Sequence, residues 1–155
     1  MALAADRRRV LVLFEPGRGG GAALEEAREL ALAQPTALTV VCVAPRAISG
    51  ARCGNSALDF NRAVADDAAK DLDEACGRLA AAGVGAEYQL LIDGAGPSLE
   101  QFAAAGEFEL VLLPARRRPL LGPTHPAAPR LARVGGIGIR VVDSRRRAAS
   151  VPARY

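Results

Sequence analysis

Glu15 and the glycines that follow it are the residues of this chain whose spacing most suggests chemistry. Gly17–Ala22 has the pattern G-x-G-x-x-A and joins an apolar run, Val10–Phe14, to a helical stretch. Backbone N–H groups at such a helix start can attract anions. A dinucleotide fingerprint is disfavoured, because Glu15-Pro16 precedes the first glycine and the second strand ends without an acid. The segment therefore predicts either an anion cradle or a plain glycine turn.

Catalytic chemistry is not indicated by the single histidine, His125, which lies between Thr124 and Pro126. No G-x-S-x-G nucleophile motif and no H-E-x-x-H zinc motif is present. The acids of the helix expected at 57–82 have the spacing of a solvated face. We therefore predict no catalytic residue and no metal site.

Basic residues are concentrated in three arginine triplets, Arg7–Arg9, Arg116–Arg118 and Arg145–Arg147, within a net charge of +3. No aromatic residues are interleaved with them, so nucleic-acid binding is not predicted. Arg116–Arg118 has two possible roles. Its guanidinium groups can bind phosphate, or they can form a solvated basic loop.

The three cysteines are odd in number and have no C-x-x-C spacing, so neither a disulfide framework nor a zinc site is suggested. Cys42 lies in an apolar run and Cys76 on an expected helix, and both are predicted to be buried thiols. Cys53 lies in a polar loop and is expected to be accessible.

Apolar runs and helical periodicity alternate along the chain and predict a five-stranded parallel sheet with helices on both faces. In such folds ligands bind at the carboxyl ends of the strands. The expected strands are Val10–Phe14, Ala37–Val43, Ala86–Ile92, Glu109–Leu113 and Ile137–Val142. The expected helices are Ala22–Ala33, Ala57–Ala82, Pro97–Ala105 and a short one at Pro129–Val134. The loops Ala44–Ser56 and Pro114–Pro129 are expected to be irregular.

We predict one domain at residues 9–143, an N-terminal extension at 1–8 and a mobile basic tail at 144–155. No apolar run approaches the ~18 residues that span a bilayer, and Met1–Asp6 is too short for a signal peptide. A cytoplasmic protein with no membrane partner is therefore expected.

The order of these elements resembles the universal stress protein family from about Arg9 to Val142. RVLVLFEPG is similar to that family's opening strand, LTVVCVAP to its second strand and FELVLLPARR to its fourth. RLARVGGIGIRVV resembles the family's final segment. The resemblance implies the same α/β fold, a stress-related binding role without catalysis, and a homodimer formed through the last strand, here with Ile137, Ile139 and Val141.

Members of that family that bind ATP carry G-x2-G-x9-G-[S/T] after the fourth strand. Here the first two glycine positions fall on Pro114 and Arg117, and the third falls near His125-Pro126, or on Gly122-Pro123 with a gap. Proline has no N–H to offer a phosphate. The family's adenine-facing aspartate corresponds to Glu15, which is one methylene longer.

Two functions follow from the resemblance and the residues. The first is a non-catalytic binding module that does not bind ATP in the usual way and has no cofactor. The second is a nucleotide- or anion-binding sensor for ATP or AMP. Its expected site residues are Glu15, Gly19, Gly20, Gly21, Val43, Arg116, Arg117, Gly122 and Thr124.

Overall fold

The computed structural model describes residues 7–17, 20–44, 56–118 and 122–143. The predicted parallel sheet is confirmed: five strands lie in the order β3-β2-β1-β4-β7, and every pairing between neighbours is parallel. The strands are β1 (Arg8–Leu13), β2 (Thr36–Ala44), β3 (Ala86–Ile92), β4 (Leu110–Pro114) and β7 (Gly138–Val142). The helices are α1 (Ala22–Ala33), α2 (Ser56–Ala81), α3 (Leu99–Ala105) and α4 (Ala128–Ala132).

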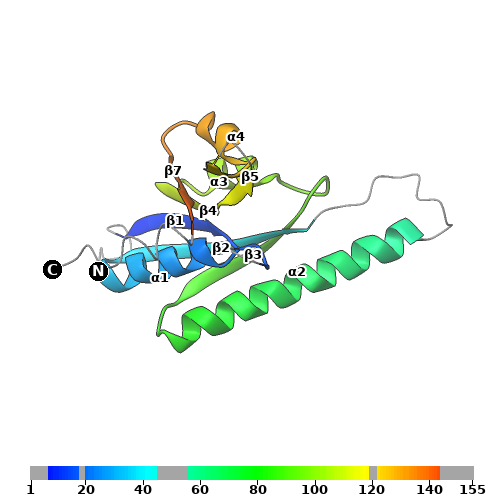
Figure 1. Cartoon of the computed structure of the whole chain (residues 1–155), viewed down its shortest axis with the longest axis horizontal. Helices are drawn as coiled ribbons and strands as arrows, with labels where there is room; N and C mark the ends of the chain where they lie inside the picture. Colours follow the sequence, from blue (N-terminus) through cyan, green and yellow to red (C-terminus); the bar gives the residue numbers. More distant parts are fainter. Residues whose placement is uncertain (1–6, 18–19, 45–55, 119–121, 144–155) are drawn as a thin grey trace.

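The helices form a layer on each face of the sheet (Figure 1). α1 and α2 pack on one face, where Val10, Val12, Val40 and Leu79 are almost fully buried in one core cluster. α3 and α4 pack on the other face, where Leu131 joins a second cluster formed by the alternate strand residues. The strands are apolar on both faces because both faces are covered, which explains their unbroken apolar runs.

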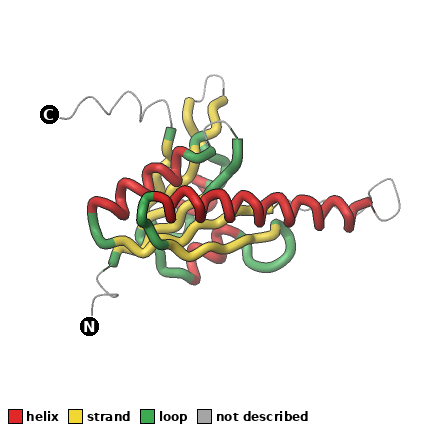
Figure 2. The backbone as a smooth tube through the Cα atoms, turned by 90° about the horizontal axis from the view of Figure 1, so that it is seen from below, coloured by secondary structure: helices red, strands yellow, loops and turns green. Residues whose placement is uncertain are grey.

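The long helix α2 packs along β2 and β3, and its first turns extend past the carboxyl ends of these strands (Figure 2). Ala68, Ala75 and Leu79 are its buried positions, at helical spacing. The chain leaves α2 through Gly83, whose φ of 77° fits the left-handed conformation predicted for a helix C-terminal glycine. None of the described helices is long and apolar enough to cross a membrane.

Three local expectations need correction. Cys76 is exposed, because it lies one residue past Ala75, off the buried stripe of α2, whereas Cys42 is buried as predicted. The helix expected from Pro97 begins at Leu99, because Ser98 and Gln101 form a reciprocal capping box that fixes its start.

The third correction concerns the loop at 114–129, which is not wholly irregular. It contains an antiparallel hairpin of β5 (Arg116–Arg118) and β6 (Gly122–Thr124). Cys53, Gly19, most of the 44–56 loop and the tail at 144–155 lie outside the described residues.

Candidate functional site

Glu15 follows β1 and is the centre of a charged cluster at the carboxyl ends of the strands. Its carboxylate accepts hydrogen bonds from Arg116, which reaches it from the β5–β6 hairpin through both Nε (3.3 Å to Oε1) and Nη2. His125, just after β6, places Nε2 3.0 Å from the same carboxylate. Residues more than 100 positions apart in sequence therefore meet at one side chain.

The bonds of His125 define which nitrogen carries its proton. Nδ1 accepts a hydrogen bond from the backbone N–H of Ala127 at 3.0 Å, so this nitrogen is unprotonated. Nε2 then carries the hydrogen and donates it to Glu15. Because the ring is only 4% exposed and both nitrogens are engaged, His125 has no free nitrogen for a substrate.

The pKa of Glu15 reflects competing effects. Burial raises the pKa of its carboxyl, but the hydrogen bonds from His125 and Arg116, together with the positive charge of Arg116, outweigh that effect. The net pKa lies below the ordinary value of 4.5. The carboxylate therefore stays ionised while bonded to both partners.

A cavity of about 350 Å³ opens beside this cluster, on the face of the sheet that carries α3 and α4. We call it the carboxyl-end cavity. Its volume is in the range of small-molecule sites. Val43 contributes an exposed apolar surface and Leu13 and Leu91 contribute buried ones. The charged residues that line it are Glu15, Asp93, Glu100, Arg116 and Arg130.

Both arginines of this cavity are neutralised by acids of the same cavity. Arg116 pairs with Glu15, and Arg130 of α4 pairs with Glu100 of α3 at 2.9 Å. Among the described residues of the lining, three acids face two arginines, so with His125 neutral this part carries one net negative charge. An incoming polyanion would meet guanidinium groups whose charge is already balanced by nearby carboxylates.

The glycine loop lies apart from this cavity. Gly17, Gly20 and Gly21 are not among its lining residues, and they lead into α1 on the opposite face of the sheet. A Cβ at Gly20 would lie 1.7 Å from the carbonyl oxygen of Glu15, so only glycine fits there. Close packing therefore explains this glycine independently of any ligand.

The other predicted site residues are divided between the cavity and its surroundings. Glu15, Val43 and Arg116 line the cavity, and Thr124 is the partly buried residue just before His125. Arg117 lies in β5 and Gly122 in β6, where only the backbone is described. Among the described residues, no group of three or more His, Cys, Asp or Glu side chains is arranged to hold a metal.

His125, Asp93, Ser98 and Glu100 were not among the predicted site residues, yet they line the cavity. Asp93 belongs to the loop 93–96 after β3, which the sequence indicates as a candidate ligand loop, whereas Ser98 lies just beyond that loop. No local signal points to His125, because its pairing with Glu15 depends on how the proline-rich segment folds back onto β1.

The fold and this cavity define a class of α/β protein in which a cavity of small-molecule size lies at the carboxyl ends of parallel strands. A family model described as "Universal stress protein family" matches residues 6–124. The chain belongs to the universal stress protein family. Comparison with curated proteins gives no match.

Solved structures of universal stress proteins share the fold. UspA from Lactobacillus plantarum superimposes with a TM-score of 0.71 at 15% identity, covering 87% of this chain and 97% of the other. A universal stress protein in complex with cAMP superimposes with a TM-score of 0.61 at 21% sequence identity, covering 88% of this chain and 97% of the other. The universal stress protein from Archaeoglobus fulgidus in complex with dAMP superimposes with a TM-score of 0.58 at 17% sequence identity, covering 88% of this chain and 98% of the other.

Proposed function

We propose that this chain is a non-catalytic binding module that does not bind ATP in the usual way. Its cavity would take a small uncharged ligand, with a nucleoside as the first candidate. The observation that carries the proposal is the pairing of Arg116 with Glu15 and of Arg130 with Glu100. The charge of each guanidinium is already matched by a carboxylate, so a phosphate would gain less from it than from an unpaired arginine.

The absence of catalysis in this proposal is supported by His125. A general base needs a nitrogen that can accept a proton from the substrate. Here Nδ1 is engaged by Ala127, and Nε2 donates to Glu15. The ring therefore fixes the loop after β6 to the end of β1, which is a structural role.

Calorimetric titration with ATP, AMP and adenosine at low and at moderate salt tests the proposal. We expect the three affinities to agree within about threefold and to change little with salt, because phosphates gain no free cation. The proposal would be overturned if ATP bound more tightly than AMP, and AMP more tightly than adenosine, with these differences disappearing at higher salt. Absence of heat with all three would exclude a nucleoside as the ligand.

The alternative is a nucleotide- or anion-binding sensor that uses the Gly17–Gly21 loop and Arg116–Arg118. It is favoured by the two structural neighbours that are complexes with cAMP and dAMP. Under this alternative Arg116 would leave Glu15 to bind a phosphate. Arg116→Ala would then weaken AMP binding by about 1–3 kcal/mol and leave adenosine binding unchanged.

We also propose that the chain forms a homodimer through β7. In support, β7 is an edge strand of the sheet, paired only with β4 among the described strands. Gly138 N–H and the Val142 carbonyl face β4, so the backbone groups of Ile139 and Val141 face outward. An edge with free backbone groups is suited to pairing with a second strand.

A further inference from the structure

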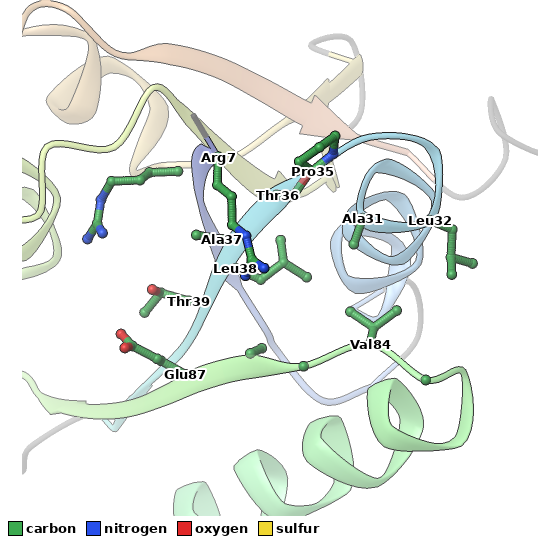
Figure 3. Close-up of a pocket in the computed structure, with 14 residues that line it drawn as sticks. Arg7, Ala31, Leu32, Pro35, Thr36, Ala37, Leu38, Thr39, Val84 and Glu87 are labelled. Carbon is green, nitrogen blue, oxygen red and sulfur yellow. The ribbon is translucent and has the colours of Figure 1, made fainter. Parts of the chain in front are cut away.

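A second cavity lies at the opposite, amino-terminal end of the sheet. Its volume is about 600 Å³, and it is lined by the starts of β1, β2 and β3 together with the last turn of α1 and the turn after α2. Figure 3 shows the Arg7 side chain along the start of β2, with Leu38 and Val84 on one side of it and Thr39 and Glu87 on the other. We call this cavity the amino-end groove.

The charges of the amino-end groove differ from those of the carboxyl-end cavity. Arg9 donates from Nε to the Gly106 carbonyl at 2.8 Å and lies 5.1 Å from the centre of the Phe108 ring, and both partners are uncharged. Arg7 is exposed and forms no ion pair within the described residues. Glu87 is the single acid among the described residues that line the groove. Two arginines without a carboxylate partner give this groove a net positive charge.

One side of the groove is apolar and open to water. Leu32, in the last turn of α1, is 59% exposed and is one of only two large hydrophobic residues exposed in the described part of the chain. The groove is also lined by Ala31, Leu38 and Val84. Leu38 and Val84 are buried and belong to the core cluster beneath α1 and α2. An apolar group placed here would shield Leu32 from water.

We propose that the amino-end groove binds a small monoanion with an apolar chain, of the class of medium-chain carboxylates. The guanidinium of Arg7 binds the carboxylate as a fork, and the chain lies over Leu32 and Val84. A concave site of this volume fits a small molecule. A polyanion is disfavoured by Glu87, and a purely ionic ligand would leave the apolar side unused.

Titration of the full chain with octanoate, followed by amide chemical shifts, tests this proposal. We expect saturable shifts at residues 31–39 and 83–87. Octanol and octylamine should bind at least about tenfold more weakly, because they lack the charge-assisted contact. Both Arg7→Ala and Leu32→Ser should weaken octanoate binding about tenfold. Arg62→Ala, an exposed arginine on α2, is the matched control and should leave it unchanged.

Equal affinity for octylamine and octanoate, or octanoate binding that survives Arg7→Ala, would overturn the proposal. So would the absence of shifts at residues 31–39. Because the groove is at the other end of the sheet, the outcome of the octanoate titration does not depend on the outcome of the nucleoside titration. Octanoate should bind equally well with adenosine present, and displacement of one by the other would show that octanoate occupies the carboxyl-end cavity instead.

Discussion

Glu15 combines two roles at the scale of a single residue. Its backbone carbonyl lies against Gly20 and so limits that position to glycine, while its side chain holds Arg116 and His125. The extra methylene of glutamate relative to aspartate lengthens the reach of the carboxylate toward the hairpin. A substitution of the side chain alone therefore separates the ionic role from the packing role.

Glu15→Gln should destabilise the protein by about 1–3 kcal/mol at pH 7, because it replaces charge-assisted bonds by neutral ones. The folded-state pKa of Glu15 is lowered, so its ionic contribution is present above the ordinary value of 4.5 and is lost as the pH falls through the folded value. The free-energy gap between wild type and Glu15→Gln should shrink between pH 6 and pH 3.

Urea unfolding at several pH values measures that gap. A difference that stays constant down to pH 3 would show that the carboxylate does not depend on its two partners for stability. His125→Asn offers a second comparison, because it removes the ring bond and leaves the pairing of Glu15 with Arg116 in place.

Only some of the residues that line the carboxyl-end cavity were predicted from the sequence. Glu15, Val43 and Arg116 were named from the sequence, because strand ends in a parallel sheet converge at one edge. His125 was missed, since an isolated histidine among prolines carries no periodicity or motif. Its role depends on a contact across 110 positions, which local patterns do not contain.

At the scale of elements, the strands and helices were predicted to within a few residues because each has a clear apolar pattern. α1 and β3 have the predicted bounds. The β5–β6 hairpin was not predicted, because its strands are only three residues each and five of their six residues are arginines, a glycine and a proline, with Thr124 the one β-branched residue. The segment is held by Glu15 as well as by its own pairing.

The loop before α1 and the helix α2 offer a matched pair of glycine substitutions. Gly20→Ala should destabilise the protein by about 1–3 kcal/mol, because its Cβ would overlap the Glu15 carbonyl. Gly77→Ala, where the added Cβ meets nothing within 4 Å on helix α2, should stabilise it by up to about 1 kcal/mol.

Thermal or urea unfolding of both variants against wild type checks this pair. Equal effects of the two alanines would mean that the glycine loop is not packed against Glu15. In that case its glycines would need another explanation, such as the anion cradle.

At the scale of the whole molecule, the sheet leaves two edges, β3 and β7. If β7 forms the homodimer, Ile139→Pro should convert dimer to monomer, because it removes an outward N–H and leaves the Gly138 bond to β4 intact. Sedimentation at micromolar concentration measures the mass. Leu90→Pro on the other edge strand is the comparison: the Asp93 N–H donates to Ala44 of β2, so the N–H of Leu90 faces outward, and its loss should not dissociate a β7 dimer.

A wild-type chain that is monomeric at micromolar concentration would exclude the homodimer. A dimer that is unaffected by Ile139→Pro would show that another surface forms it. Either result leaves the account of the Glu15 cluster unchanged, because that cluster lies within one chain.

The central claim is that the internal ion pairs of the carboxyl-end cavity exclude the usual binding of a triphosphate. The most direct test is a crystal structure of the chain grown with ATP. We predict that Arg116 remains paired with Glu15 and that no phosphate lies against residues 114–124. Phosphates lying along that segment, with Arg116 turned away from Glu15 toward them, would contradict the claim.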